Sequence, residues 1–313
     1  MTLALLCSSH SPLMDFNDPG DLVKSEVDGV FARAREFVAD FDPTLVVSFG
    51  PDHYNGFFYD LMPPFAVCYA GVGVGDYGTQ EGPFDVPEDI AHGMTEHAQQ
   101  AGIDMTISRA AQLDHGAVQI PQLVLGGIDR CPTVPVFVNG VSAPFVPMQR
   151  IRLMGAALGE YLSGLDERVL LIGSGGLSHD PPVPRWATAT DQQKEFLLSG
   201  RNPTPEARAA RQERVISGGK AFAAGEAPHI RELNPAWDEE FMDVCASGDS
   251  QRFDAYTAEQ MVLDAGNSAH EVRCWVAACS AMAAAGPYRV TDRYYRAIPE
   301  WIAGFGYLAA LSA

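Results

Sequence analysis

The strongest constraint on the fold is a set of short, continuous apolar runs that alternate with helical patterns. The runs are Leu3–Cys7, Leu45–Phe49, Val134–Val138 and Val169–Gly173. Such runs are typical of strands that are buried on both faces of a sheet. Amphipathic patterns over residues 23–41, 87–102 and 148–165 predict helices between them. The alternation predicts an α/β fold with a mostly parallel or mixed central sheet, covered by helices on both faces.

The rest of the chain suggests an excursion from this core rather than a second domain. Residues 188–254 are more polar and mostly helical in pattern, and an apolar helix over 270–286 then returns to the core. We therefore expect residues 1–313 to form a single domain. The six cysteines include no C-x-x-C pair, which predicts reduced, buried side chains rather than a disulfide framework.

The charge balance limits the classes of partner. With 21 basic and 40 acidic residues, the net charge is −19, which disfavours binding to nucleic acid or to an anionic membrane. An anionic substrate would need a local cluster of Arg or Lys. No apolar run reaches the length of a membrane span, and the first residues lack the basic region of a signal peptide. We expect a cytoplasmic protein.

Three of the eight histidines occupy equivalent positions just after expected strands. They are His10, His53 and His179. Loops after parallel strands lie along one edge of the sheet, where ligands bind, so these imidazoles are predicted to converge. His115 lies in a polar turn before an apolar helix and is a candidate to join them.

A carboxylate that could complete this cluster is Glu271, for which the sequence leaves two interpretations. The spacing Ser268-x-x-Glu271 before an apolar run is that of a helix capping box. Alternatively, Glu271 and two neutral imidazoles could hold Fe(II) on one face and leave positions open for substrate and O₂.

The segment GSGGLSHDPP, residues 173–182, resembles a phosphate-binding loop only in its first half. It lacks the Gly-Lys-Ser/Thr ending of a P-loop, the spacing of a dinucleotide fingerprint and the first glycine of a serine-hydrolase elbow. We interpret the glycines as allowing a tight turn that brings His179 to the ligand site.

Several longer motifs resemble those of the class III extradiol ring-cleaving dioxygenases, of the protocatechuate 4,5-dioxygenase beta-subunit superfamily. These motifs extend over nearly the whole chain: SSHSPL, PDHYNGFFYD, MPPF, DHG, PVFVNGV, GSGGLSHDPPVP, LNPAWD, HEVRCWVAA and YYRAIPEWIAGFG. The resemblance implies a non-haem Fe(II) enzyme that forms a homo-oligomer. It implies cleavage, with O₂, of a catechol that carries a propionate side chain, such as 3-(2,3-dihydroxyphenyl)propionate.

The resemblance also implies roles for particular residues. His10, His53 and Glu271 match the metal ligands, which favours the metal interpretation of Glu271 over the cap. His115 and His179 match an acid–base pair, for which we assign His179 as the base and His115 as the proton donor. The reverse assignment of the two is equally compatible with the sequence.

The side-chain carboxylate of such a substrate needs a cationic partner. Candidates are Arg296, Arg293 and Arg273, each of which could equally be an ordinary surface or structural arginine. Other readings also stay open: a related dioxygenase for a gallate-, dihydroxyphenylalanine- or bicyclic-type catechol, a Zn²⁺-dependent hydrolase, or a metal-binding relative without catalytic activity.

Overall fold

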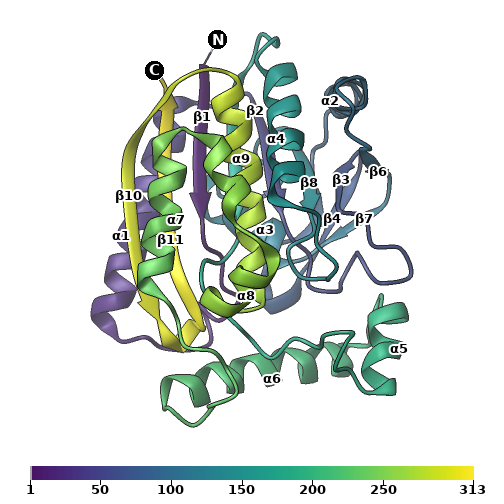
Figure 1. The fold of residues 1–313 in the computed structure, drawn as a ribbon, viewed down its shortest axis with the longest axis vertical. Coiled ribbons are helices and arrows are strands. Elements are labelled where there is room, and N and C mark those ends of the chain that lie inside the picture. The colour runs from purple at the N-terminus through teal and green to yellow at the C-terminus, as the bar shows by residue number, and fades with distance from the viewer. Residues whose placement is uncertain (1) are drawn as a thin grey trace.

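The computed structural model describes residues 2–313 and is built on a large mixed sheet with helices on both faces (Figure 1). Its eight strands follow the order β10-β11-β1-β9-β2-β8-β3-β6. Their bounds are β1 Thr2–Ser8, β2 Leu45–Gly50, β3 Phe65–Cys68, β6 Thr106–Ser108, β8 Thr133–Val138, β9 Arg168–Ser174, β10 Tyr288–Ile298 and β11 Ala303–Ser312. A small second sheet has the order β5-β4-β7 and consists of β4 Gly71–Val74, β5 Glu81–Pro83 and β7 Ala111–Leu113.

The four strands predicted from apolar runs form the centre of the large sheet. β1, β9, β2 and β8 are neighbours and are all parallel. The antiparallel neighbours β11 and β3 flank them on either side. The α/β fold class with a mixed sheet is therefore confirmed, and all residues of β2 and β8 are buried, as continuous apolar runs require.

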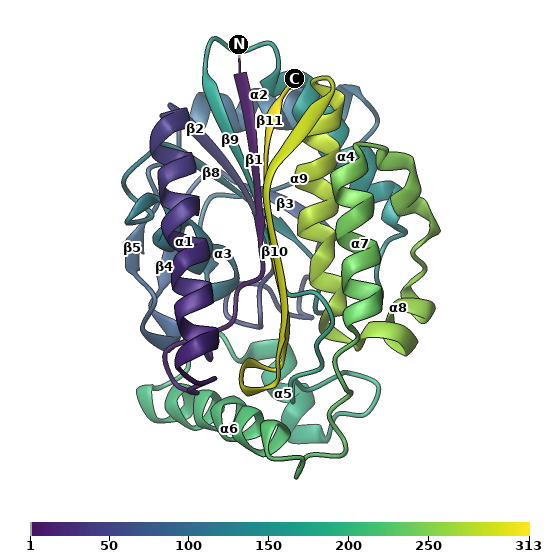
Figure 2. The same ribbon diagram turned by 90° about the vertical axis from the view of Figure 1, so that its left-hand side faces the viewer.

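Helices cover both faces of this sheet (Figure 2). α1 and α3 pack with one core cluster, whereas residues of α2, α4, α7 and α9 belong to another. The bounds are α1 Asp21–Phe41, α2 Glu88–Gln100, α3 His115–Leu125, α4 Met148–Leu162, α5 Asp191–Ser199, α6 Pro205–Ala223, α7 Pro235–Ser247, α8 Ala258–Ala265 and α9 Arg273–Ala284. Four short 3-10 turns complete the elements: η1 Asp76–Gly78, η2 Ser250–Ala255, η3 Ser268–Val272 and η4 Pro299–Trp301.

Of the excursion predicted over residues 188–254, α5 and α6 lie beyond the carboxyl ends of the central strands (Figure 1), whereas α7 packs in the core, where Phe241 and Cys245 are buried. The side chain of Asn17 joins α6 to the main body, since its Nδ2 donates to the carbonyl oxygens of Ile216 and Glu300. Because ligands of parallel sheets bind at this edge, α5 and α6 are placed to cover a site.

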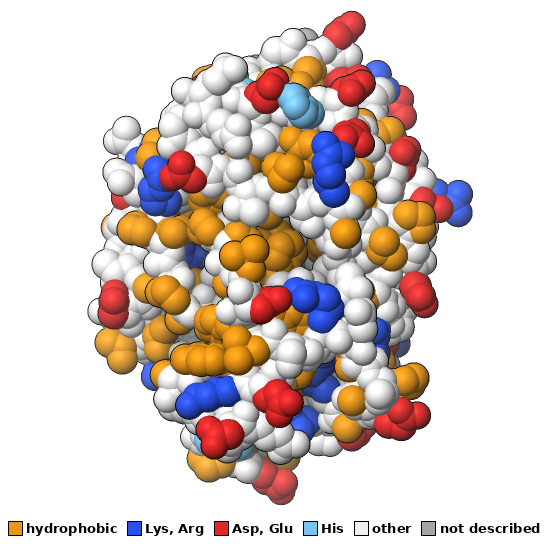
Figure 3. All heavy atoms as spheres, turned by 90° about the vertical axis from the view of Figure 1, so that its right-hand side faces the viewer, with side chains coloured by type: hydrophobic (Ala, Val, Ile, Leu, Met, Phe, Trp, Pro, Cys, Tyr) orange, Lys and Arg blue, Asp and Glu red, His pale blue; other side chains and the backbone are white. Residues whose placement is uncertain are grey.

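The surface is mixed in character. The face in Figure 3 carries interspersed acidic and basic side chains, with hydrophobic ones gathered across its middle. β4, β6 and α5, which lie on this side in Figure 1, contribute the exposed Val72, Ile107 and Leu198. All six cysteines are buried and free, as predicted. Within residues 2–313, no helix is both long and apolar enough to cross a membrane.

Candidate metal and catalytic site

The carboxylate of Glu271 is the centre of the histidine cluster. Its Oε1 lies 3.1 Å from Nε2 of His53 and 3.0 Å from Nε2 of His179, and its Oε2 lies 3.3 Å from Nε2 of His10. The backbone N–H of Gly176 also donates to Oε2. Burial alone would raise the pKa of Glu271, but His179 and His10 hold it well below its usual range. An ionised carboxylate therefore faces three imidazoles.

Glu271 does not cap a helix. It lies in η3, where Asn267 precedes the turn without a side-chain cap, and α9 begins at Arg273 without one as well. A Cβ on Gly175 would lie 2.4 Å from the carbonyl oxygen of Glu271, and a Cβ on Gly140 2.8 Å from its Cα. Glycine at both positions lets two neighbouring loops pack directly on the Glu271 backbone. The backbone N–H of Ser268 donates to the carbonyl oxygen of His179 at 3.3 Å and not to Glu271, so the capping interpretation is wrong.

His10 follows β1 and is fixed as one tautomer. Ser174 Oγ donates to the carbonyl oxygen of Gly116 at 2.6 Å, so it can only accept from Nδ1 of His10, which is 3.0 Å away. The Nε2 lone pair of His10 is thereby left to face the cluster. Burial lowers the pKa of His10 to about 3, and an imidazole must be neutral to bind a metal ion.

His53 follows β2 and is held by Asp114, the N-cap of α3. Asp114 Oδ1 accepts from the N–H of Gly116, and Oδ2 accepts from the backbone N–H of His53 at 2.7 Å and from its Nδ1 at 3.1 Å. Burial would lower the pKa of His53, but the charges of Asp114 and Glu271 raise it well above its usual value. A carboxylate behind an imidazole is a typical arrangement at metal sites, because it orients the ring and strengthens its basicity.

His115 is the first residue of α3, and its ring stacks on His53 with centroids 4.4 Å apart. Asp76 accepts from its backbone N–H at 2.8 Å and from its Nδ1 at 2.5 Å, so Nε2 is the nitrogen left for other partners. One donor atom from each of His10, His53 and His115 lies within 4.8 Å of the others. His10 and His53 thus belong both to this triad and to the contacts of Glu271.

His179 reaches the cluster through the glycine-rich loop after β9. Its Nδ1 donates to the carbonyl oxygen of Leu177 at 2.8 Å, and its Nε2 faces Glu271. A Cβ on Gly176 would lie 2.6 Å from Cε1 of this ring, so the loop accommodates His179 only because position 176 is glycine. Burial would lower the pKa of His179, but the charge of Glu271 raises it.

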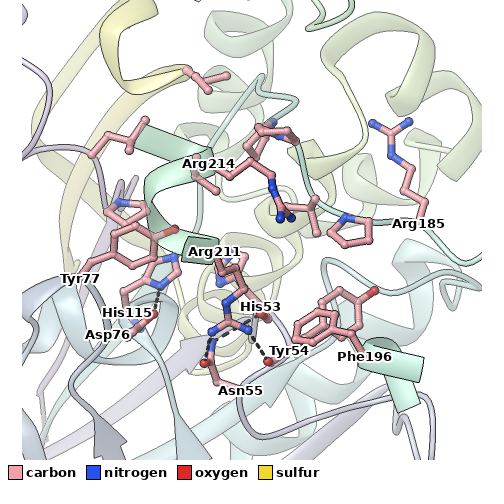
Figure 4. A pocket seen from close by; sticks show the side chains of 18 of the residues that line it. His53, Tyr54, Asn55, Asp76, Tyr77, His115, Arg185, Phe196, Arg211 and Arg214 are labelled. Atoms are coloured by element: carbon pink, nitrogen blue, oxygen red, sulfur yellow. Dashed lines mark hydrogen bonds and ion pairs between the residues drawn. The ribbon is translucent and has the colours of Figure 1, made fainter. Parts of the chain in front are cut away.

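The histidine cluster opens into a cavity of about 780 Å³. Figure 4 shows His53, His115 and Asp76 at one side and Arg211 and Arg214 of α6 extending into the same space. The other walls are largely apolar. They include Leu13, Pro181, Pro182, Val183, Phe196, Trp301 and Ile302. Catalytic and binding sites commonly combine such walls with a few polar groups.

The three arginines predicted to bind a carboxylate are not among the described residues that line this cavity. Arg296 of β10 pairs with Glu26 of α1 at 2.7 Å, and Arg293 of β10 pairs with Asp243 of α7. Arg273 is buried, donates to the carbonyl oxygen of Val146 and lies over the ring of Phe145. The side chains of Arg293 and Arg296 project from an edge strand and that of Arg273 from a helix in the core, so the prediction is corrected. The cavity is lined instead by Arg185, Arg211 and Arg214.

Sequence reasoning also missed the carboxylates behind the histidines. Asp114 precedes His115 directly in the motif DHG, and its N-cap position was a usable signal. Asp76 lies 39 residues before His115 and carries no comparable signal.

The residues present fit a divalent metal ion. They offer the Nε2 atoms of two imidazoles, a buried carboxylate that faces both, and a hydrogen-bonded partner behind each ring. This donor set matches the two-histidine, one-carboxylate group that is typical of non-haem Fe(II) oxygenases.

Comparisons with known proteins also indicate an oxygenase. The family described as "Catalytic LigB subunit of aromatic ring-opening dioxygenase" matches residues 4–306. A protein of Rhodococcus rhodochrous named 2,3-dihydroxyphenylpropionate/2,3-dihydroxicinnamic acid 1,2-dioxygenase is 57% identical, over 99% of this chain and 98% of its own. Proteins with the same name from Rhodococcus jostii and Azotobacter vinelandii are 52% and 48% identical, and at least 99% of each chain is covered.

Proposed function

Because the chain belongs to the LigB family of aromatic ring-opening dioxygenases, we propose that its substrates are 3-(2,3-dihydroxyphenyl)propionate and 2,3-dihydroxycinnamate. The proposed reaction is extradiol cleavage. The ring C–C bond next to the diol breaks, both atoms of O₂ enter the product, and 3-(2,3-dihydroxyphenyl)propionate becomes a 2-hydroxy-6-oxo-nona-dienedioate. No further reductant is needed. The observation that carries this proposal is the convergence of the Nε2 atoms of His10, His53 and His179 on Glu271 at one wall of the cavity, with the ring of His115 stacked on His53.

We propose that the metal is Fe(II), held by His10, His53 and Glu271. His10 and His53 are favoured because both contact Glu271 and both belong to the donor triad. When bound, Fe(II) would bring the catechol oxygens and O₂ together and let electrons pass between them.

His179 serves as the base that removes a proton from a catechol hydroxyl, and His115 as the acid that supplies a proton when the O–O bond breaks. The group behind each ring supports this division. Nδ1 of His179 donates to a neutral carbonyl, whereas Nδ1 of His115 donates to the carboxylate of Asp76. The carboxylate of Asp76 fixes the orientation of the His115 ring and leaves its Nε2 directed away from Asp76, as delivery of a proton at a fixed place requires.

The test of the function is single-turnover oxygen uptake. Protein loaded with Fe(II) without oxygen is mixed with 3-(2,3-dihydroxyphenyl)propionate and then exposed to air. One O₂ consumed per substrate, with a yellow ring-opened product, is the expected result. Metal-loaded protein that consumes no O₂ with this substrate but does so with a gallate- or bicyclic-type catechol would refute the substrate assignment.

The residue roles are tested by comparing metal content with turnover. Glu271→Gln should lose Fe(II), whereas His115→Gln and His179→Gln should retain it and lose about 10²- to 10⁴-fold in turnover. Loss of Fe(II) in His115→Gln would favour the triad of His10, His53 and His115 as the metal site instead.

Three further properties are part of the proposal. Residues 1–313 form one such catalytic domain. The protein assembles as a homo-oligomer, for which the hydrophobic side chains gathered on the face in Figure 3 are candidates for contact. The six free cysteines agree with a cytoplasmic location. Light scattering and cell fractionation test the last two.

A further inference from the structure

One face of α6 turns toward the cavity. The residues of α6 that line it follow the spacing of a single helix face: Ala207, Ala210, Arg211, Arg214 and Val215. Arg211 and Arg214 are the charged members of this face, and Figure 4 shows that both extend into the cavity.

The guanidinium of Arg211 is already engaged by the protein. It donates to the carbonyl oxygen of Tyr54 at 3.0 Å and to Oδ1 of Asn55 at 2.5 Å, and it lies over the ring of Phe196. Its hydrogen bonds attach α6 to the loop that follows His53. Arg185 is similarly engaged, because it pairs with Asp180 at 2.6 Å.

Arg214 differs from both. Within residues 2–313, its guanidinium makes no hydrogen bond and no ion pair with another side chain. It lines the same cavity as the histidine cluster, and the acidic side chains of that cavity, Asp76 and Glu271, are bound to histidines. Its five N–H donors are therefore available to a ligand.

We propose that Arg214 binds the side-chain carboxylate of the substrate; this inference rests on the proposed function. The catechol end of the substrate lies at the histidine cluster, and the carboxylate lies against α6. An arginine pairs with a carboxylate through two parallel hydrogen bonds, and it would offset locally the repulsion expected from a net charge of −19. Arg214 is thus a specificity-determining residue that selects catechols with an anionic side chain.

The experiment compares 3-(2,3-dihydroxyphenyl)propionate with the uncharged, similarly sized 3-propylcatechol. Arg214→Gln should raise KM for the carboxylate substrate by about 10- to 100-fold, the loss expected for one charged hydrogen-bonded pair. KM and kcat for 3-propylcatechol should stay within about twofold. Arg214→Lys should recover part of the lost affinity, because it keeps the charge but not the planar pair of donors.

The matched control is Lys220→Gln, which removes the same charge from α6 at an exposed position outside the cavity. It should change KM and kcat for neither substrate. An equal rise in KM for both catechols in Arg214→Gln, or a selective rise in Arg185→Gln in its place, would overturn the inference.

A binding measurement separates this inference from the proposed function. Calorimetric titration of 3-(2,3-dihydroxyphenyl)propionate into metal-free protein without oxygen requires no turnover. Weaker binding by Arg214→Gln than by the wild type supports the inference even if no catechol is oxidised, whereas equal binding refutes it. Failure of the proposed function would instead appear as wild-type protein that consumes no O₂ with any catechol.

Discussion

Substitution of Asp114 by asparagine tests whether the carboxylate behind His53 sets metal affinity. Asp114 is fully buried and accepts four hydrogen bonds: one at Oδ1 from Gly116, and three at Oδ2 from the backbone and Nδ1 of His53 and from Nδ2 of Asn55. An asparagine has one acceptor oxygen and one NH₂ group, so either orientation turns a donor toward a donor.

The less costly orientation places the amide oxygen at the Oδ2 position and leaves the N–H of Gly116 without a partner. One buried, unsatisfied donor costs about 1–3 kcal/mol of folding free energy. Nδ1 of His53 would also donate to a neutral amide oxygen, and such a hydrogen bond is about half as strong as one to a carboxylate. Changes of this kind behind a metal-bound histidine reduce metal affinity by about 10- to 100-fold.

The assay is competition for Fe(II) with a chromophoric chelator in the absence of oxygen, together with urea unfolding of the metal-free protein. Asp249→Asn is the matched control, because Asp249 also caps a helical turn but is exposed and contacts no histidine. If folded Asp114→Asn binds Fe(II) as tightly as the control does, Asp114 acts only as a helix cap and the argument for His53 is wrong.

Three other outcomes follow from the geometry. Gly175→Ala should cost about 3 kcal/mol and abolish Fe(II) binding, because the new Cβ would meet the backbone of Glu271, whereas Gly29→Ala in the open middle of α1 should raise stability by about 0.5–1 kcal/mol in the same urea titrations. Burial raises the pKa of Asp238 from about 3.8 to about 6, so the stability that its proton contributes is lost as pH rises through 6. Relative to Asp238→Asn, the wild type should lose about 2.4 kcal/mol of unfolding free energy between pH 4 and 7, and a difference that is flat or rises with pH would contradict this. Fe(II) at about 100 times its Kd should raise the unfolding free energy of the wild type by about 2.7 kcal/mol and leave Glu271→Gln unchanged, as measured by urea unfolding without oxygen.

The central strands were predictable because a strand buried on both faces is apolar at every position. The C-terminal hairpin of β10 and β11 was not, for two different reasons. β10 is a half-buried edge strand with polar residues throughout, such as Asp292 and Arg293. β11 is rich in alanine and glycine, and its glycines reflect contacts made from elsewhere: a Cβ on Gly304 would lie 2.1 Å from Oδ2 of Asp238. A sequence pattern indicates which positions of one element are buried. It does not indicate which other element packs closely against them.

The site shows the same division. The positions of His10, His53 and His179 follow from strand topology, since loops after parallel strands share one edge of the sheet. Which arginine lines the cavity does not follow from the topology. It depends on the direction in which each side chain projects from an element that is distant in the sequence. Arg296 lies within the motif YYRAIPEWIAGFG, yet its register in β10 directs it to Glu26 of α1.

One chain of hydrogen bonds connects α6, which covers the cavity, to the loop that carries His53. Arg211 of α6 donates to Oδ1 of Asn55, Nδ2 of Asn55 donates to Asp114, and Asp114 accepts from Nδ1 of His53. Both the Oδ1 and the Nδ2 of Asn55 are used in this chain, so the position of α6 and the orientation of the His53 ring depend on each other. Displacement of α6 would free Asn55 to rotate and would leave Asp114 with one partner fewer. A substrate that pairs with Arg214, one helical turn from Arg211, would hold α6 in place and would thereby also stabilise the geometry of His53. In this arrangement, recognition of the carboxylate and alignment of His53, the proposed metal ligand, both depend on α6.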